Sequence, residues 1–189
     1  MKKQLVLLLL FPFFMNYAHA QLNMAGIGIT HGATNVKDID LDSRLTGGHF
    51  SIETPLGGYS FRFDLAYLSR LGDKPAIPSL DNLLNVRLGY GVIIGEGKRF
   101  QIPLFGHAGY NSSSGDLQLK HWGVGARGGI RIFLTPKIAI YGDVNGDYIF
   151  ANNTKYINAS GIEQVLDLNP INIQFNAGLM FMYLKKNKE

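Results

Sequence analysis

The sequence NPINIQFNAGLMFMY, residues 169–183, decides the fold class of this chain. In steps of two it alternates between an apolar set and a mostly polar set. The apolar set is Ile171, Ile173, Phe175, Ala177, Leu179, Phe181 and Tyr183, and the other is Asn172, Gln174, Asn176, Gly178, Met180 and Met182. Successive side chains of a strand leave opposite faces, so the pattern predicts a β-strand with one apolar face. About 9–11 residues of tilted strand cross a hydrocarbon layer, and this stretch is long enough.

Seven earlier stretches alternate in the same way. They are Leu22–Gly32, Leu45–Thr54, Tyr59–Leu68, Leu84–Ile94, Arg99–Tyr110, His121–Leu134 and Ile138–Tyr148. Pro and Gly favour tight turns, and short Pro- or Gly-containing turns follow the second, fourth and sixth strands. The odd-numbered strands are followed by longer segments, predicted as loops: 33–44, 69–81, 111–120 and 149–168. The chain is thus predicted to be all-β, with eight strands and one domain.

The first twenty residues have the features of a cleavable export signal. Lys2 and Lys3 precede an apolar run, Leu5–Met15, and Ala18-His19-Ala20 is a small-x-small cleavage site. The apolar run is shorter than the roughly 20 residues of a spanning helix. We therefore predict a signal peptide of residues 1–20, cleaved after Ala20, and a β-barrel domain of residues 21–189. A retained signal anchor is the alternative.

Composition excludes several classes of protein. The chain has no Cys, which rules out a disulfide framework, a thiolate metal site and a Cys nucleophile. Removing Lys2 and Lys3 leaves 16 of the 18 basic residues against 14 acidic ones. No basic cluster is interleaved with aromatic residues, so nucleic-acid binding is not predicted.

The two faces of the predicted sheet differ in chemistry, which raises the question of which face is inside. Charges of both signs lie on the polar face: Glu53, Arg62, Asp64, Arg87, Arg127, Arg131, Asp143 and Asp147. A soluble barrel, lipocalin-like if it binds a lipophilic ligand, would turn this face to solvent. Glycine is frequent on the same face, and a narrow barrel needs room inside for long Arg side chains. Aromatic residues near the strand ends suit two interfacial girdles. We therefore predict the polar face inside, with the four Arg paired to the four carboxylates.

Two motifs then carry a resemblance to a known family. The segment Gly125–Tyr141, GARGGIRIFLTPKIAIY, resembles the strand–Thr-Pro–strand hairpin of small bacterial outer-membrane β-barrels, the OmpA/OmpX-like group. The spacing Asn176-x-Gly178-x-x-Phe181-x-Tyr183 resembles their terminal-strand assembly signal. The chain departs from the pattern because it continues past Tyr183 through Lys185–Glu189.

The resemblance implies an eight-stranded antiparallel transmembrane up-and-down β-barrel with short periplasmic turns and longer external loops. It also implies a monomer in the bacterial outer membrane. The expected partners are outer-membrane lipids, lipopolysaccharide and the outer-membrane assembly machinery.

No catalytic or metal-binding motif is present. The His residues lack HxxxH or HExxH spacing, so neither a metal site nor a cofactor is predicted. Asp38, Asp40 and Asp42 alternate in the first loop, but the EF-hand Gly and terminal Glu are missing, which favours a solvated acidic loop. Ser112, Ser113 and Ser114 lie in the third predicted loop beside His121 and leave a lipid-modifying enzyme as an alternative. The main prediction is a non-enzymatic barrel that serves envelope integrity, surface interaction or weak small-solute passage.

Overall fold

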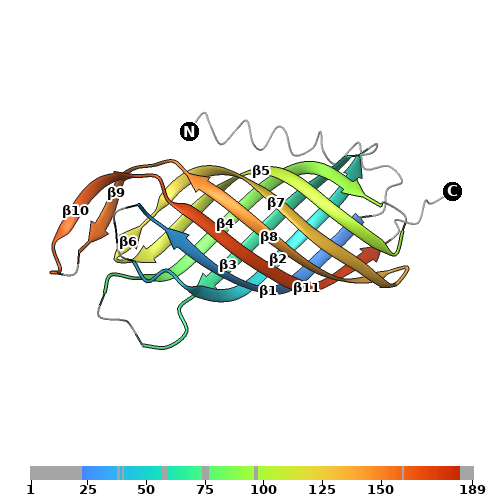
Figure 1. The fold of residues 1–189 in the computed structure, drawn as a ribbon, viewed down its shortest axis with the longest axis horizontal. Helices are drawn as coiled ribbons and strands as arrows, with labels where there is room; N and C mark the ends of the chain where they lie inside the picture. The colour runs from blue at the N-terminus through green and yellow to red at the C-terminus, as the bar shows by residue number, and fades with distance from the viewer. Residues whose placement is uncertain are drawn as a thin grey trace.

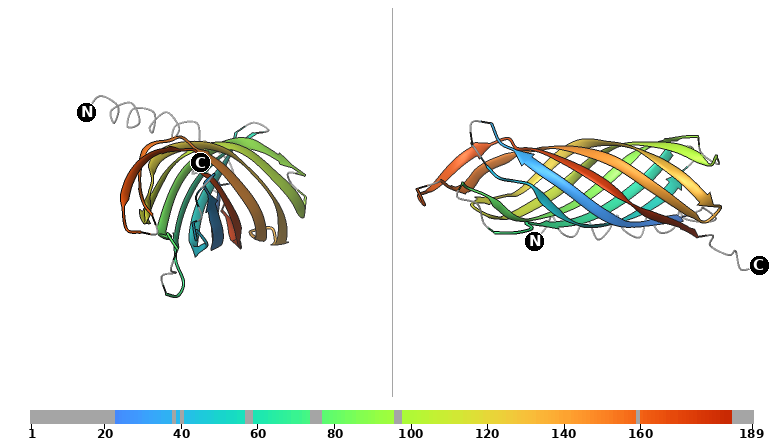
Figure 2. Two further views of the ribbon diagram at one scale, coloured as in Figure 1. Left: turned by 60° about the vertical axis from the view of Figure 1, so that its left-hand side comes forward. Right: turned by 60° about the horizontal axis from the view of Figure 1, so that its bottom comes forward.

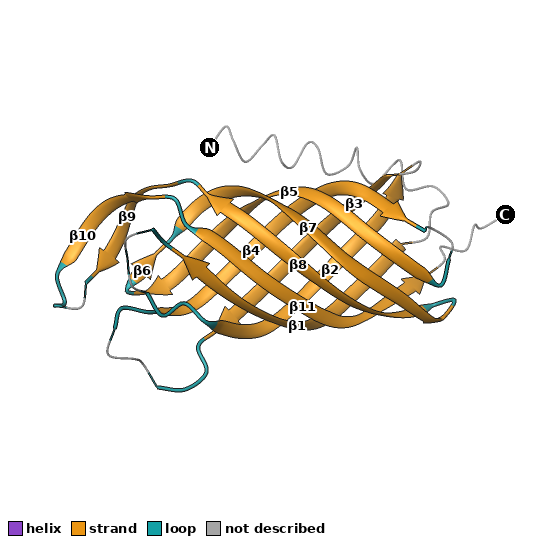
Figure 3. Cartoon of the chain, viewed as in Figure 1, coloured by secondary structure: helices purple, strands orange, loops and turns teal. Residues whose placement is uncertain are grey.

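The computed structural model describes residues 23–37, 39, 41–56, 59–73, 77–95, 98–158 and 160–183. The predicted signal peptide and the Lys185–Glu189 tail therefore lie outside the described residues. The regular structure of the described residues consists of strands (Figure 3). They are β1 (Asn23–Asn35), β2 (Leu45–Leu56), β3 (Tyr59–Ser69), β4 (Leu80–Ile94), β5 (Phe100–Gly115), β6 (Leu117–Gln118), β7 (Lys120–Thr135), β8 (Ile138–Ile149), β9 (Ala151–Ile157), β10 (Glu163–Leu168) and β11 (Ile171–Tyr183). In the described part of the chain, no helix is long and apolar enough to span a membrane.

Eight strands close into one antiparallel barrel in the order β1-β11-β8-β7-β5-β4-β3-β2 (Figures 1 and 2). The eight predicted strands correspond to these eight, so the predicted fold class is correct. The predicted closing strand pairs with β1 from Asn23↔Tyr183 to Asn35↔Ile171, over the full 13 residues of β1. Because the ladder is closed, neither strand is left with a free edge.

The loops predicted at 33–44 and 69–81 are shortened by strand ends, since β1 runs to Asn35 and β4 begins at Leu80, and the other two differ more. The segment 111–120 was predicted as a loop, but β5 continues to Gly115 and β6 follows it. The segment 149–168 contains β9 and β10, which pair with β6 in a small sheet of order β10-β9-β6. Figure 1 shows β9 and β10 projecting beyond the barrel. β9 and β10 pair as a hairpin within one connection, whereas β6 comes from a different connection and joins this hairpin through β9.

The polar face of the barrel wall is inside and the apolar face is outside. On β3, Arg62 and Asp64 are 1% and 6% exposed, whereas Leu65 and Tyr67 are 39% and 53% exposed. The same parity holds on β11, where Asn172 and Gln174 are buried and Ile173 and Phe175 are exposed. A lipocalin-like barrel needs an apolar interior. This barrel has a polar interior, so the lipocalin-like alternative is wrong.

Glycines on the inner face have two different roles. Some leave room for side chains, as predicted: a Cβ on Gly109 would lie 2.8 Å from Arg87 Cγ, and also 2.7 Å from the Val86 carbonyl oxygen. Others allow neighbouring strands to approach closely, since a Cβ on Gly91 would lie 1.9 Å from the Leu104 carbonyl oxygen. The second role was not predicted. Glycines of this kind allow the sheet to curve strongly enough to close into a narrow barrel.

Apolar clusters fill both ends of the barrel interior. The loop-end cluster lies where the longer connections meet: Val36, Leu45, Ala66, Leu68, Leu80, Leu83, Leu117, Leu119, Ile149, Ala151 and Tyr156. The turn-end cluster lies beside the short turns: Met24, Phe133, Ala139, Tyr141 and Met180, with Ile93 and Met182 packed against it. The polar interior is therefore enclosed between two apolar layers.

Candidate functional site: the polar interior

The structure brings the eight predicted interior charges into two groups. The group nearer the short turns is one continuous chain of ion pairs that starts at Glu53 on β2. Its carboxylate accepts hydrogen bonds from Arg131 at 2.8 Å and from Arg62 at 3.1 Å. Arg62 Nε also donates to Asp64 at 2.9 Å. Arg127 then joins Asp64, at 2.5 Å, to Asp143.

The second group is centred on Asp147 of β8, nearer the loop end. Arg87 Nη2 donates to Asp147 Oδ2 at 2.5 Å and to Gln174 at 2.9 Å. The Nε2 atom of His107 lies 2.6 Å from Asp147 Oδ1, and Asn172 donates to the same carboxylate at 3.2 Å. This carboxylate therefore has three partners from three other strands.

These ion pairs cross the lumen. β7 and β2 stand four places apart in the ring of eight strands, so the Arg131–Glu53 pair joins opposite walls. The Arg127–Asp64 and Arg87–Asp147 pairs each span three places. All of these side chains are buried. Charged groups that are buried but fully paired fix geometry, and removing one partner leaves a costly unpaired charge.

Amides and one His extend the network beyond the charged residues. Asn172, Gln174 and Asn176 point inside as expected, and Asn176 donates to Asp143 at 2.7 Å. Gln174 donates to Asn85 at 2.6 Å, and Asn85 donates to Asn111. The predicted site did not include His107, Asn85, Asn111 or Gln101. Asn85 has the same parity as Arg87 on β4, and the other three lie on the polar parity of β5, which carries no predicted charge. That parity was the signal that could have identified them.

Three of the residues considered for catalysis or metal binding have other partners in the structure. Ser113 is buried, donates to the Leu117 carbonyl at 2.7 Å and accepts from the Leu119 N–H. His121 Nε2 lies 3.2 Å from the Thr154 hydroxyl. Asp42 accepts from Arg70 at 2.9 Å, whereas Asp38 and Asp40 lie outside the described residues. No group of three or more His, Cys, Asp or Glu that could hold a metal occurs among the described residues.

The terminal-strand motif is divided between the two faces of β11. Asn176 and Gly178 have the inner parity, and Phe181 is outside with 39% exposure. Gly178 allows the closing strands to approach, since a Cβ there would lie 2.1 Å from the Ile27 carbonyl oxygen. The motif therefore lies on the seam with β1.

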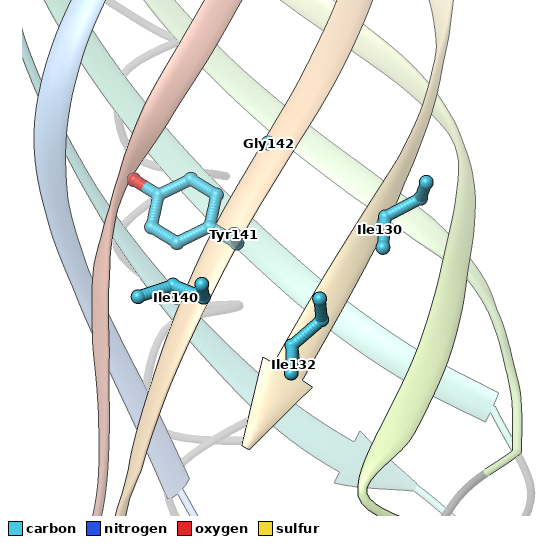
Figure 4. A pocket seen from close by; sticks show the side chains of 5 residues that line it. All are labelled: Ile130, Ile132, Ile140, Tyr141 and Gly142. Atoms are coloured by element: carbon cyan, nitrogen blue, oxygen red, sulfur yellow. The ribbon is translucent and has the colours of Figure 1, made fainter. Parts of the chain in front are cut away.

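The outer wall is apolar and has aromatic pairs toward both ends. Tyr59 stacks on Tyr90 near the short turns, and Tyr110 meets Trp122 edge-on near the loop end. A hollow of about 240 Å³ lies between β7 and β8, lined by Ile130, Ile132, Ile140, Tyr141 and Gly142 (Figure 4). Gly142 is the register partner of Ile130. Because Gly142 has no side chain, the space beside Ile130 stays open as this hollow. It has no charged lining residue and is unsuited to catalysis.

An apolar outer band with aromatic ends around a polar interior defines the fold of the small outer-membrane β-barrels. Solved structures establish the same fold. Neisserial surface protein A matches with a TM-score of 0.65 and 12% identity, over 85% of this chain and 97% of that chain. OprG of Pseudomonas aeruginosa matches with a TM-score of 0.60 and 12% identity, over 87% and 96%. Ail, the attachment invasion locus protein of Yersinia pestis, matches with a TM-score of 0.54 and 11% identity, over 85% and 99%.

No protein-family model and no curated protein sequence matches the chain. At 11–12% identity the structural likeness establishes the fold alone. The resemblance on which the sequence prediction rested is therefore confirmed at the level of the eight-stranded transmembrane barrel.

Proposed function

We propose that this chain is a non-enzymatic, non-conducting outer-membrane barrel that holds an ordered set of external loops for envelope integrity or surface interaction. Its membrane location is supported by the apolar outer wall, with Ile29 and Phe175 69% and 57% exposed. Side chains of this kind on a soluble surface would form an apolar patch far larger than soluble monomers carry. The predicted signal peptide, cleaved after Ala20, is part of this proposal.

One observation carries the non-conducting part of the proposal: the enclosed polar interior. Four Arg and four carboxylates balance in charge and bond to one another, and three of the pairs cross the lumen. The others join residues of the same or neighbouring strands. Aliphatic side chains such as Leu68 and Leu117, both fully buried, lie above them at the loop end. An ion crossing this barrel would have to displace paired charges and pass two apolar layers, which raises its barrier. This argues against the small-solute passage that the sequence left open.

The surface role is supported by contacts that tie the external connections together. Arg70 donates to Asp42 of the first connection and to the Leu80 carbonyl at 2.6 Å. Asp116 of the third connection accepts from the Ser79 N–H at 2.9 Å and from the Ile157 N–H at 2.7 Å. Connections that are ordered in this way present a fixed surface, which lowers the entropic cost of binding a partner.

Fractionation tests membrane residence, the coarser half of the proposal. The protein is expected in the outer-membrane fraction, soluble only with detergent, with a gel mobility that changes on heating. Phe181→Asp, which places a charge on the outer face of the closing strand, should lower the amount assembled, and Lys155→Asp on the loop-end sheet is the matched control. A mature protein that stays soluble without detergent would show the proposal to be wrong.

Planar-bilayer recording tests the non-conducting half. The wild-type protein should give no discrete current steps above the bare bilayer, whereas Glu53→Ala with Arg131→Ala should raise leakage by removing a crossing pair. Reproducible steps from the wild-type protein would favour small-solute passage instead. Lipid A and phospholipid mass spectra that change with expression of the protein would favour the enzyme alternative.

A further inference from the structure

The three methionines outside the predicted signal belong to one apolar cluster at the short-turn end of the barrel interior. Of the five Met in the sequence, two belong to the predicted signal, and the other three are Met24, Met180 and Met182. Met24 and Met182 are direct register partners on β1 and β11. Met180 lies two residues before Met182 on β11 and therefore on the same face. Met24 and Met180 are 4% and 1% exposed, and Met182 packs against the same turn-end cluster.

Strand geometry brings these three thioethers within reach of one another. Directly opposed residues in an antiparallel pair have Cα atoms about 4.5–5.5 Å apart. Residues two apart on one strand project from the same face. Methionine is unbranched with three rotatable side-chain bonds, so three such side chains can converge on one point. Two strands from opposite ends of the sequence therefore place three thioether side chains in one cluster.

The sulfur of Met24 faces the lumen as an acceptor. Arg131 Nη1 donates to Met24 Sδ at 3.3 Å, while its guanidinium is held by Glu53 at 2.8 Å. The lone pairs of this sulfur are thus directed at polar partners. Arg131 keeps its Glu53 and Gln101 contacts if Met24 turns away, since Gln101 also accepts from Arg131 at 3.2 Å.

Thioethers discriminate strongly between metal ions. They are soft, uncharged ligands that select Cu(I) over hard divalent ions, which prefer carboxylates, carbonyls and water. A monovalent ion suits this position, because the neighbouring charges of Glu53, Arg62, Asp64, Arg127, Asp143 and Arg131 already balance. Met182 is only partly buried, which gives an ion access from the short-turn end.

We propose that Met24, Met180 and Met182 form a binding site for a soft monovalent cation, Cu(I) or its analogue Ag(I), at the short-turn end of the barrel. In the outer-membrane orientation this end faces the periplasm. The proposal rests on the sulfur cluster and does not depend on whether the barrel conducts or on what its loops bind.

The test is a titration of the mature protein, residues 21–189, folded in detergent micelles, with Ag(I). Ag(I) needs no reductant and is therefore the simpler probe. Nuclear magnetic resonance of ¹³C-methyl-labelled methionine should show the three methyl signals shifting together and saturating at one ion per barrel. Replacing Met182 by Leu should weaken binding by at least roughly tenfold. The Met24→Leu, Met180→Leu, Met182→Leu triple variant should abolish binding, which equilibrium dialysis against Ag(I) measures because this variant has no methionine to label.

The leucine variants keep volume and apolarity, and exchanges of this kind are among those that a packed core tolerates best. Their folding is checked by heat-modifiable gel mobility, and Met182→Leu alone serves if the triple variant does not fold. Unshifted methyl signals in the wild-type protein would overturn the proposal, and the methionines would then be packing residues only. Undiminished Ag(I) binding in a folded leucine variant would overturn it as well.

Discussion

The middle of the barrel and its loop end close the same cylinder with opposite chemistry. In the middle, long charged side chains such as Arg131 and Glu53 reach across the lumen and depend on bonds between named atoms. At the loop end, side chains such as Leu68 and Leu117 fill the space without a directional bond. Ion pairs of this kind are intolerant of losing a partner, whereas apolar packing loses stability in proportion to the volume removed. The middle should therefore fix the shape of the barrel, and the loop end should fix the arrangement of the connections.

The largest effect is expected from Glu53→Gln, which removes the charge shared by Arg62 and Arg131. Breaking a buried pair costs about 3–5 kcal/mol. Urea unfolding of the protein in lipid vesicles, followed by the fluorescence of Trp122, the only Trp, measures the loss. The control is Glu163→Gln, whose ion pair with Lys155 is 55% exposed on both sides and is expected to change stability by less than about 1 kcal/mol. Equal stability of the two variants would show that the buried ion pairs of the barrel middle stabilise the protein no more than the exposed pair does.

A smaller and more local effect is expected from Leu117→Ala in the loop-end cluster. Leu117 is fully buried, and large-to-small changes of this kind cost about 2–5 kcal/mol where the site cannot collapse. Because β6 has only two residues paired with β9, the loss should stay within the small sheet. Hydrogen exchange should accelerate in β9 and β10 while the barrel amides keep their protection. Acceleration throughout the barrel would show that the two regions are one cooperative unit.

Arg70→Lys tests the contact between the two loop-end connections. The guanidinium bonds Asp42 Oδ2 at 2.9 Å, the Asp42 carbonyl at 2.7 Å and the Leu80 carbonyl at 2.6 Å. A compact ammonium cannot reproduce this fork, so a loss of about 1.5 kcal/mol is expected. Limited proteolysis of the first connection, compared with Arg44→Lys at an exposed site, measures it. Unchanged cleavage rates would show that the loop-end apolar cluster, and not Arg70, holds this connection in place.

The smallest effect is a pH dependence of the same contact. Partial burial acts to raise the pKa of Asp42. Hydrogen bonds from Arg70 and from the Arg44 N–H act to lower it and outweigh burial, so the net shift of the pKa is downward. A carboxyl with a lowered folded-state pKa stabilises the fold above its unfolded value of 3.8, and the contribution is lost as pH falls through the folded pKa. Hydrogen exchange at residues 41–44, corrected for its intrinsic pH dependence, should therefore be flat from pH 7 to about 5 and rise below about 4. Arg70→Lys should weaken this rise.

Alternation along the chain predicted the barrel wall because every strand has one face in the lumen and one outside. The ion-pair partners were predictable as a set, since eight charges of both signs share the inner parity. The individual pairs were not, because Arg131 meets Glu53 through barrel closure, which brings β7 and β2 to opposite walls.

The pairing of β6 with β9 and the methionine cluster were missed for one physical reason, whereas β9 and β10 form a local hairpin. Each depends on segments that are distant in sequence, such as Leu117 with Tyr156 or Met24 with Met182. Local periodicity reports the face of a side chain and carries no information about which distant segment it meets. The alternating Leu117 and Leu119 were the one local sign that 111–120 was more than a loop.

The seam between β1 and β11 also bears on how the chain could be rearranged. Asn23 and Tyr183 are register partners, so the two ends of the barrel sequence are neighbours in space. A covalent link between them would span a single inter-strand gap, and new termini opened at Pro136–Lys137, in an exposed short turn, would interrupt no ladder. Such a circular permutant should fold to the same cylinder. Its closing strand would then be β7, which would show whether the terminal motif is read by position or by sequence.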